Sequence, residues 1–286
     1  MQGLDLITLG IYEKAFPAMS LPGCLRAAGA AGYDFVELSI DESDDRLERL
    51  NWSSSQKAAL RRTALSIGMP MTSMCLSAHR RFPMGSASPD IRQKSLDIVR
   101  KAVDLACDLG VRMVLIPGYD VFYEPSSPAT RASFVEGLYQ AVHWASRSGV
   151  MLVLENTESS ITSITQTVEF VNQIRSPWLQ LYGDIGNLNA LGYDVNAELE
   201  AGAGHLAGIH VKDTTAGTFR HIPLGQGTVP FVEAFRTLWK IGFCGPVMLE
   251  LWGDEAGDPL RTVTEARRWL EARLLESCRE PVAKSP

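Results

Sequence analysis

Residues 151–184 read MLVLENTESSITSITQTVEFVNQIRSPWLQLYGD. The apolar segments Met151–Glu155 and Leu179–Asp184 at the two ends have the length and the Val, Ile and Leu content of buried β-strands. The longer stretch between them has helical periodicity, so these residues are expected to form one strand–helix–strand unit. Apolar segments of this kind recur along the whole chain, each followed by a longer helical stretch, and such alternation is typical of a parallel α/β fold.

Eight apolar segments are expected to form strands. They are Leu6–Gly10, Phe35–Ile40, Thr72–Leu76, Met113–Pro117, Met151–Glu155, Leu179–Asp184, Ala207–Val211 and Val247–Leu251. Eight consecutive strand–helix units of this length predict a closed (β/α)8 TIM barrel, in a single domain that spans residues 1–286. The charged, proline-containing tail 277–286 is expected to be frayed.

Helical periodicity is clear in Lys94–Leu109, where apolar residues fall on one face and Gly110 is expected to end the helix. An open doubly wound sheet is the alternative architecture, and it would normally need a nucleotide-binding fingerprint near its first turn. The nearest match, Gly202–Ala207, leads into a predicted strand instead of following one. It therefore does not predict a nucleotide site.

Composition and charge limit the class of protein. The chain has 27 Lys and Arg against 33 Asp and Glu, a net charge of -6, so a general nucleic-acid binder is not expected. Apolar runs are shorter than the roughly 18 residues of a membrane span, and no signal-peptide pattern opens the chain, so we expect a cytoplasmic protein with no membrane partner. The 5 cysteines form no CxxC pair and are expected to be reduced thiols, mostly in the core.

Polar residues end four successive predicted strands: Glu155, Asp184, His210 and Glu250. TIM barrels place their active sites at the C-terminal ends of the strands, so we expect these four side chains to point into one mouth. Three carboxylates and an imidazole form an oxygen-rich ligand set for one divalent cation, with Mn²⁺ expected first and Zn²⁺ or Mg²⁺ as alternatives. Without a cation the carboxylates would raise one another's pKa, whereas a dication reverses that balance.

A glycine-containing loop follows His210. The segment Ile209–Asp213 is followed by Pro223–Gly227 and then by Val229–Phe231, which is expected to begin the next helix. Because glycines permit close backbone approach, the amides exposed at this turn and helix start can bind an anion, and a tight turn without a ligand is the alternative.

Several motifs together resemble a known family. They are Leu9–Ala15, Phe35–Glu37 with Asp41 and Glu42, Ser73–Pro83, Gly118–Asp120, Asp184–Leu188, His210–Thr214 and Cys244–Pro246. In this order they cover nearly the whole chain and resemble the L-ribulose-5-phosphate 3-epimerases, also called L-xylulose-5-phosphate 3-epimerases, of the xylose isomerase-like TIM barrel superfamily. The resemblance implies a single-metal sugar-phosphate epimerase of pentose phosphate or L-ascorbate catabolism. It also implies a homodimer.

Carried over by position, the resemblance assigns Glu155, Asp184, His210 and Glu250 as metal ligands, with Glu155 and Glu250 also as the two catalytic bases. Inverting C3 of a 2-ketose requires removal of a proton from one face and its return to the other, so two bases must flank the carbon. A metal between them would stabilise the cis-enediolate, and no organic cofactor is needed. One departure is Glu158, where relatives typically have an aspartate, so any contact to the substrate is made by a longer side chain.

The phosphate of such a substrate needs a cationic end of the pocket. Candidate cations follow three predicted strands: Lys14, then His79 with Arg80 and Arg81, then Lys212. Ser77 and Asn187 are candidates for hydrogen bonds to sugar hydroxyls. The aromatic residues near predicted strand ends are expected either to wall the pocket, with Trp252 a candidate for substrate contact, or to pack in the core. They are Tyr12, Phe82, Tyr119 and Trp252.

Three other functions share parts of this pattern. A ketose–aldose isomerase, acting on a hexulose 6-phosphate or on hydroxypyruvate, would use the same metal and bases but move the carbonyl, and the sequence does not separate it from an epimerase. A DNA-repair nuclease of this architecture would need a histidine-rich zinc cluster, whereas the chain has 5 histidines, with His143 expected in mid-helix, and an acidic balance. A non-catalytic sugar-binding barrel would have no reason to keep four ligand-type residues at consecutive strand ends.

Overall fold

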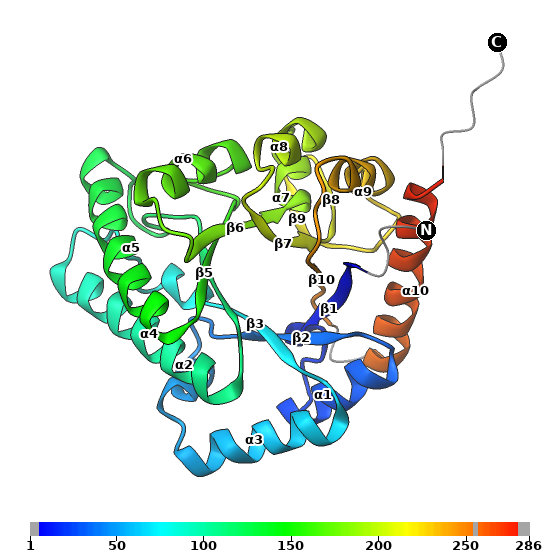
Figure 1. Cartoon of the computed structure of the whole chain (residues 1–286), viewed down its shortest axis with the longest axis horizontal. Coiled ribbons are helices and arrows are strands. Elements are labelled where there is room, and N and C mark those ends of the chain that lie inside the picture. The colour runs from blue at the N-terminus through cyan, green and yellow to red at the C-terminus, as the bar shows by residue number, and fades with distance from the viewer. Residues whose placement is uncertain (1–5, 254–256, 280–286) are drawn as a thin grey trace.

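Eight parallel strands form a closed barrel in the computed structural model, which describes residues 6–253 and 257–279 (Figure 1). The strands are β1 (Thr8–Tyr12), β2 (Phe35–Ser39), β3 (Met71–Cys75), β4 (Met113–Pro117), β5 (Met151–Glu155), β6 (Leu179–Asp184), β7 (Leu206–Val211) and β10 (Pro246–Leu249). They follow chain order around the barrel, and β10 closes the ring by pairing with β1. The predicted (β/α)8 barrel is confirmed.

Helices surround the barrel (Figure 1). They are α1 (Leu21–Ala30), α2 (Asp44–Leu47), α3 (Ser54–Ile67), α4 (Pro89–Leu109), α5 (Pro128–Ser148), α6 (Ile164–Ile174), α7 (Ile185–Ala190), α8 (Val195–Ala201), α9 (Phe231–Lys240) and α10 (Pro259–Ser277), with 3₁₀ helices η2 (Glu13–Ala15), η3 (Glu48–Asn51) and η4 (Ser77–Arg80). Helix α4 ends as predicted, with Gly110 at φ 78°, but it begins before Lys94, because the Ser88 hydroxyl accepts a hydrogen bond from Ile91 N and caps its first turn.

The first strand is displaced from its prediction, because β1 begins at Thr8 and not at Leu6. Pairing with β10 buries Ile11 completely, whereas Leu6 is 55% exposed. Gly10 allows β1 to lie against β2, since a Cβ atom at this position would come within 2.1 Å of the Phe35 ring. The barrel therefore starts where the chain can approach its neighbours, and not where the apolar run starts.

A two-stranded hairpin, absent from the sequence prediction, follows β7. Its strands β8 (Asp213–Thr215) and β9 (Thr218–Ile222) pair antiparallel, and Gly217 takes a left-handed conformation, with φ 72°, in the turn. Helix α9 then begins at Phe231, as predicted. The hairpin inserts an extra polar segment beside the barrel mouth.

Two buried clusters stabilise the barrel. The larger one packs the strands against the surrounding helices. The smaller one lies among side chains of seven of the eight barrel strands and contains Tyr12, Phe35, Cys75, Met113, Leu115, Val153, Tyr182 and Met248. Because side chains fill the interior of a TIM barrel, ligands are bound at the mouth, above this cluster.

The cysteines correct one expectation. All five are free, but Cys24 and Cys75 are buried while Cys107, Cys244 and Cys278 are exposed, so the prediction of mostly buried thiols is wrong. Helical periodicity and loop positions turn the last three toward solvent, which residue type alone does not reveal.

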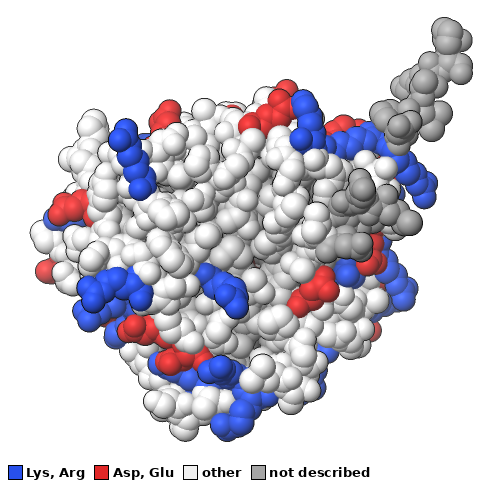
Figure 2. Space-filling view, viewed as in Figure 1, with Lys and Arg blue, Asp and Glu red and all other residues white. Residues whose placement is uncertain are grey.

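Among residues 6–253 and 257–279, no helix combines the length and apolar character needed to cross a membrane. Charged side chains of both signs lie mainly around the edge of the face shown in Figure 2. Of the tail predicted to be frayed, Ser277 is the last residue of α10, and its hydroxyl accepts a hydrogen bond from Trp239 Nε1 at 2.8 Å. Residues 280–286 of that tail lie outside the described residues.

Candidate active site at the barrel mouth

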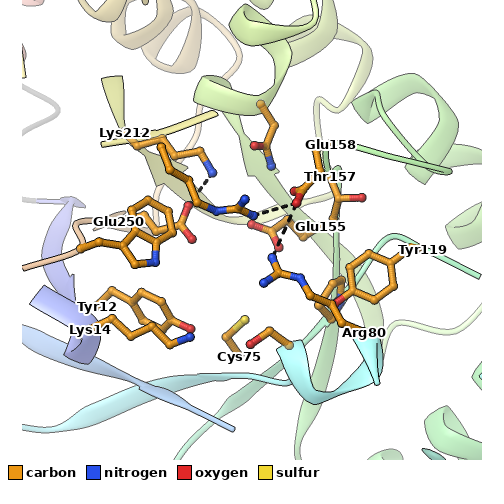
Figure 3. Close-up of a pocket in the computed structure, with 15 residues that line it drawn as sticks. Tyr12, Lys14, Cys75, Arg80, Tyr119, Glu155, Thr157, Glu158, Lys212 and Glu250 are labelled. Atoms are coloured by element: carbon orange, nitrogen blue, oxygen red, sulfur yellow. Dashed lines mark hydrogen bonds and ion pairs between the residues drawn. The ribbon is translucent and has the colours of Figure 1, made fainter. Parts of the chain in front are cut away.

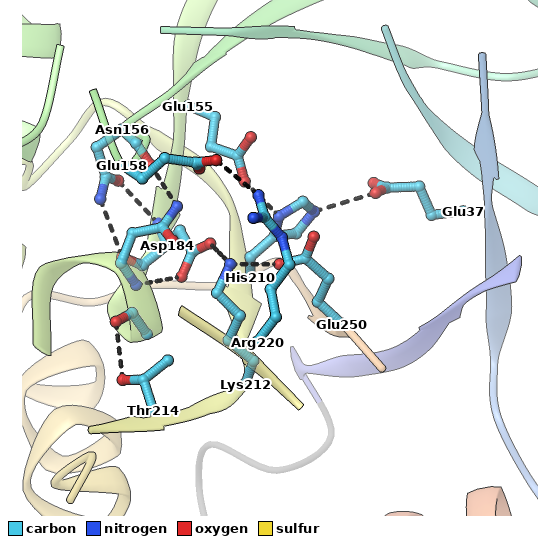
Figure 4. Close-up of polar contacts among 12 residues, drawn as sticks. Glu37, Glu155, Asn156, Glu158, Asp184, His210, Lys212, Thr214, Arg220 and Glu250 are labelled. Carbon is cyan, nitrogen blue, oxygen red and sulfur yellow. Dashed lines mark hydrogen bonds and ion pairs between the residues drawn. The ribbon is translucent and has the colours of Figure 1, made fainter. Parts of the chain in front are cut away.

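The four ligand-type residues predicted from the strand ends meet in one place. Glu155 ends β5, Asp184 ends β6, His210 lies near the end of β7 and Glu250 follows β10. One ligand atom from each residue lies within 4.8 Å of the others. Asp184 and His210 are almost completely buried, and Glu155 is 7% exposed. We refer to these four residues as the acidic tetrad (Figure 4).

Three ion pairs connect the acidic tetrad, and two of them are made by Lys212. His210 Nδ1 lies 2.6 Å from Glu155 Oε1. The ammonium of Lys212, which is 4% exposed, lies 2.7 Å from Asp184 Oδ2 and 2.6 Å from Glu250 Oε2. A positive charge is therefore already held between two of the carboxylates, as expected where buried like charges need compensation.

The electrostatics of the acidic tetrad follow from burial and from its neighbours. Burial raises the pKa of Glu155, and the nearby Asp184 and Glu250 carboxylates act in the same direction, while His210 opposes them. Burial also raises the pKa of Asp184. For Glu250, burial is outweighed by the Lys212 ammonium, which lowers its pKa. The same donor set, with three carboxylates and an imidazole close together, fits one divalent cation.

Glu37 is a fourth carboxylate at this site, and the sequence did not predict it as functional. It lies in β2 with no exposed surface, and its Oε1 is 3.1 Å from His210 Nε2. The Ser73 hydroxyl donates a hydrogen bond to Glu37 Oε2 at 2.5 Å. The Tyr182 ring packs edge-on against His210, with ring centroids 4.5 Å apart. Together these contacts fix the imidazole so that Nδ1 faces the rest of the acidic tetrad, a role typical of residues behind metal ligands.

Asn156 fixes the ends of β5 and β6 relative to each other. Its side chain donates to Asp184 O at 3.0 Å and accepts from Asp184 N at 2.8 Å. Asn187 adds a second connection, because its side-chain amide donates to Asn156 O at 2.9 Å while its backbone N–H donates to Asp184 Oδ1 at 2.9 Å. Sequence reasoning missed Asn156, because its partner Asp184 lies 28 residues further along the chain.

A pocket opens above the acidic tetrad, and Glu155 and Glu250 are part of its lining. Its lining includes seven of the eight residues predicted to bind substrate: Lys14, Ser77, Arg80, Glu158, Asn187, Lys212 and Trp252. Tyr12 and Tyr119 also line it, as expected for aromatic residues at strand ends. Figure 3 shows Lys14, Cys75 and Arg80 along one side of this pocket and Lys212 with Glu250 across from them.

His79 is the predicted substrate-binding residue that the structure does not bring to the pocket lining. Its imidazole is 2% exposed, and neither ring nitrogen has a hydrogen-bond partner among the described residues. Burial lowers its pKa to about 4, so it is neutral near pH 7 and is not a cation for a phosphate. Arg81 forms a surface ion pair with Asp44, and Phe82 lines a separate recess beside α4.

Glu158 contacts two arginines with its longer side chain. Its Oε1 accepts from Arg220 at 2.8 Å and lies 3.7 Å from Arg80 Nη2. Arg220 comes from β9 and was missed because the hairpin was not predicted. The Trp252 ring lies 5.6 Å from the Arg220 guanidinium and 5.6 Å from the Lys212 ammonium, so it makes cation–π contacts with both at the pocket edge.

In the glycine loop after His210, the amides of Gly225 and Gly227 are already occupied, which favours a tight turn over an anion site. The Asp213 carboxylate accepts hydrogen bonds from Gly225 N at 2.7 Å and from Gly227 N at 2.9 Å. A Cβ atom on Gly227 would lie 2.1 Å from Asp213 Oδ1. The glycines are therefore needed for close approach, as predicted, but the anion they receive is a side chain of the protein itself.

Comparisons with known proteins agree with this geometry. The family model of xylose isomerase-like TIM barrels matches residues 25–273. The chain is 45% identical over 276 residues to the L-ribulose-5-phosphate 3-epimerase UlaE of Escherichia coli (strain K12), covering 95% of this chain and 96% of that protein, and the UlaE of Shigella boydii serotype 18 gives the same values. These relatives confirm the resemblance stated from the sequence motifs and the prediction of an isomerase-class enzyme.

Solved structures support the fold. A D-psicose 3-epimerase in the presence of D-fructose has a TM-score of 0.80 at 16% identity, covering 94% of this chain and 99% of that chain. An L-ribulose 3-epimerase has a TM-score of 0.78 at 20% identity, covering 98% and 100% of the two chains. At these identities the likeness establishes a shared barrel architecture.

Proposed function

We propose that this chain, which belongs to the family of xylose isomerase-like TIM barrels, is a metal-dependent epimerase that interconverts L-ribulose 5-phosphate and L-xylulose 5-phosphate by inverting C3. The observation that carries this proposal is the acidic tetrad, in which two glutamates from separate strands face one pocket. The 45% identity to proteins named L-ribulose-5-phosphate 3-epimerase supports the same substrate.

Glu155, Asp184, His210 and Glu250 would hold one divalent cation, with Mn²⁺ proposed first and Zn²⁺ or Mg²⁺ as alternatives. When bound, the cation would stabilise negative charge that develops on the substrate oxygens at C2 and C3. Glu37 holds the His210 ring, and Asn156 holds the Asp184 backbone, so the chain itself keeps two of the four ligands in place.

Glu155 and Glu250 would act as the two bases. Strands β6 and β7 lie between β5 and β10 in the barrel, so the two carboxylates approach the pocket from separate directions. One glutamate would accept the C3 proton on one face of the sugar, and the other would return a proton to the opposite face. Both transfers use side chains of this protein, so the proposal requires no organic cofactor.

The remaining pocket residues would orient the sugar. Asn187 and Glu158 line the pocket beside Glu155, and Trp252 covers the side next to Glu250. Holding C3 between the two bases is as important as the bases themselves, because proton transfer requires hydrogen-bonding distance.

The experiment is proton NMR of the Mn²⁺-loaded protein with L-ribulose 5-phosphate in D₂O, beside the variants Glu155→Gln and Glu250→Gln. Deuterium at C3, with L-xylulose 5-phosphate as product, is expected for the wild-type protein and is expected to be lost in both variants. Deuterium at C1 of the recovered ketose and at C2 of an aldose product would instead indicate a ketose–aldose isomerase. Absence of exchange on any ketose phosphate would indicate a sugar-binding barrel without catalysis.

A further inference from the structure

We propose that Asp120 is a positioning residue, which acts through Ser160 to hold the carboxylate of Glu158 at the pocket wall. Asp120 lies in the loop after β4, residues 118–127, and Ser160 lies in the loop after β5, residues 156–163. Glu158 lines the pocket, whereas Asp120 and Ser160 are not part of its lining. The proposal rests on the proposed function only for the reaction with which its effect on catalysis is measured.

The Asp120 carboxylate connects the two loops. Asp120 has no exposed surface, and its Oδ2 accepts hydrogen bonds from Ser126 at 2.8 Å and from Thr130 at 2.5 Å. Its Oδ1 accepts a hydrogen bond from the Ser160 hydroxyl, and the backbone N–H of Asp120 donates to the same Ser160 oxygen at 3.4 Å. Ser126 belongs to the loop after β4 and Thr130 to α5, so Oδ1 alone reaches the loop after β5.

The charge of Asp120 strengthens this connection. Burial alone would raise the pKa of Asp120, but the hydrogen bonds from Ser160, Thr130 and Ser126 outweigh it and lower the pKa below its usual value. The carboxyl group is therefore ionised near pH 7. Hydrogen bonds to an ionised acceptor are shorter and stronger than those between neutral groups.

Ser160 has a backbone conformation that requires support. Its φ is 65°, in the left-handed region that residues other than glycine rarely adopt. Such a conformation costs free energy and persists only where the surrounding contacts fix it. The Ser160 side chain is bound to Asp120, and the Ser160 carbonyl oxygen accepts a hydrogen bond from the Arg131 side chain at 3.3 Å. This strained residue lies two positions after Glu158.

Backbone hydrogen bonds fix both ends of the turn that carries Glu158. Thr157 N donates to Ile161 O, and Ile161 N donates to Gly118 O, both at 2.9 Å. The Thr157 hydroxyl also donates to Gly118 O, at 3.1 Å. The conformation of residues 158–160, between these fixed points, therefore depends on how Ser160 is held.

The position of the Glu158 carboxylate affects the pocket wall directly. Its Oε1 accepts a hydrogen bond from Arg220 at 2.8 Å and lies 3.7 Å from Arg80 Nη2. All three residues line the pocket, so a shift of the turn would displace the carboxylate and both of its cationic partners. Displacements of about 1 Å at a reacting site can lower a rate about 100-fold, so a residue outside the pocket can control catalysis in this way.

The test uses two matched deletions of a hydroxyl. Ser160→Ala and Ser126→Ala each remove one hydrogen bond to the Asp120 carboxylate, but only Ser160 belongs to the loop that carries Glu158. With Mn²⁺ and L-ribulose 5-phosphate, Ser160→Ala is expected to lower kcat/KM about tenfold, a typical effect of one lost hydrogen bond to a charged group. Ser126→Ala is expected to keep the wild-type value.

A double-mutant cycle tests whether the effect passes through Glu158. In the variant Glu158→Ala, the added substitution Ser160→Ala should have no further effect on kcat/KM. Independent losses that multiply in the double variant would overturn the proposal.

Ser160→Gly separates positioning from stability. Glycine adopts the left-handed conformation without strain, so the free energy of unfolding should stay close to the wild-type value while kcat/KM still falls. Wild-type kcat/KM in either Ser160→Ala or Ser160→Gly would overturn the proposal.

Crystal structures of Ser160→Ala and Ser126→Ala provide a measurement that does not depend on turnover. The contact between Glu158 Oε1 and Arg220, 2.8 Å in the wild-type structure, is expected to be lost in Ser160→Ala and kept in Ser126→Ala. If both variants keep it, Asp120 does not position Glu158. If the wild-type protein does not epimerise L-ribulose 5-phosphate, the proposed function fails, and the crystal structures alone decide on the role of Asp120.

Discussion

The two halves of the barrel mouth differ in what they leave unsatisfied. The half that follows β5, β6, β7 and β10 holds three carboxylates whose charges are compensated by His210 and Lys212. The half that follows β1 to β4 holds hydroxyls and a guanidinium with unpartnered atoms and no comparable cluster of buried carboxylates at the described pocket lining. Under the proposed function, the first half would hold the cation and move the protons, whereas the second offers hydrogen-bond donors to the substrate.

The largest expected loss of activity is in the half of the mouth that follows β5, β6, β7 and β10. Replacing Glu155 or Glu250 by glutamine removes a base and is expected to lower kcat about 10²–10⁴-fold. Ser77→Ala, in the other half, should act mainly on KM. Steady-state kinetics with L-ribulose 5-phosphate distinguish an effect on kcat from an effect on KM. The metal content of each variant is measured as a control for loss of the cation. If Ser77→Ala lowered kcat as much as Glu155→Gln or Glu250→Gln does, the two halves of the mouth would not have different roles.

An effect on the free energy of unfolding is expected for His79, which lies in η4 next to the half of the mouth that follows β1 to β4. Its pKa is about 4 when folded and about 6.5 when unfolded, so above pH 6.5 both states are neutral and no penalty arises. As the pH falls from 6.5 to 4, the unfolded state binds a proton that the folded state does not, and the free energy of unfolding decreases by up to about 3 kcal/mol.

Urea denaturation across this pH range measures that loss. The variant His79→Leu should have a weaker pH dependence than the wild-type protein, whereas His143→Leu, at an exposed site on α5, should not differ from it. If His79→Leu retains the full pH dependence, the imidazole is protonated or solvated in the folded protein.

Glu37 links the halves, because it lies in β2 and contacts His210 from β7. The variant Glu37→Leu removes the group that orients the imidazole and is expected to weaken Mn²⁺ binding about 10–100-fold. Glu37→Gln keeps an acceptor for His210 and should weaken it less. Mn²⁺ titration followed by electron paramagnetic resonance measures both, and equal affinities in all three proteins would show that Glu37 has no such role.

The smallest effect is expected for Lys14→Met. The Lys14 ammonium is paired with Asp41, and Arg46 lies 3.4 Å from the same carboxylate and can partly compensate for its loss. We therefore expect the KM for L-ribulose 5-phosphate to rise only about threefold, as is usual for a partly screened charge. A rise as large as that in Ser77→Ala would instead indicate that Lys14 contacts the substrate directly.

The acidic tetrad was predictable because strand ends in a barrel share one edge. Glu155, Asp184 and Glu250 interrupt or end apolar runs, and this pattern requires no knowledge of side-chain orientation. The eight strands were predictable for the same reason, since buried parallel strands are continuous apolar runs. The displacement of β1 shows the limit of the pattern, because strand pairing and not hydropathy decides where a strand begins.

The supporting residues could not be read from the sequence. Glu37, Asn156 and Arg220 act through partners that lie far along the chain, so their roles depend on the closed barrel. His79 and Ser77 belong to the same 3₁₀ helix, yet the sequence does not indicate which of them faces the pocket. Asp213 follows the motif around His210 but is occupied by the backbone amides of the glycine loop.

The anchoring of Asp120 has a consequence for how this enzyme can change over evolutionary time. Hydrogen bonds from Ser126 and Thr130 hold the loop after β4 without using the Tyr119 side chain. The shape of the loop and the chemistry of its tip are therefore set by different residues. Mutations at position 119 can explore new substrates without rebuilding the loop, which makes this position a suitable first target for directed evolution of sugar preference.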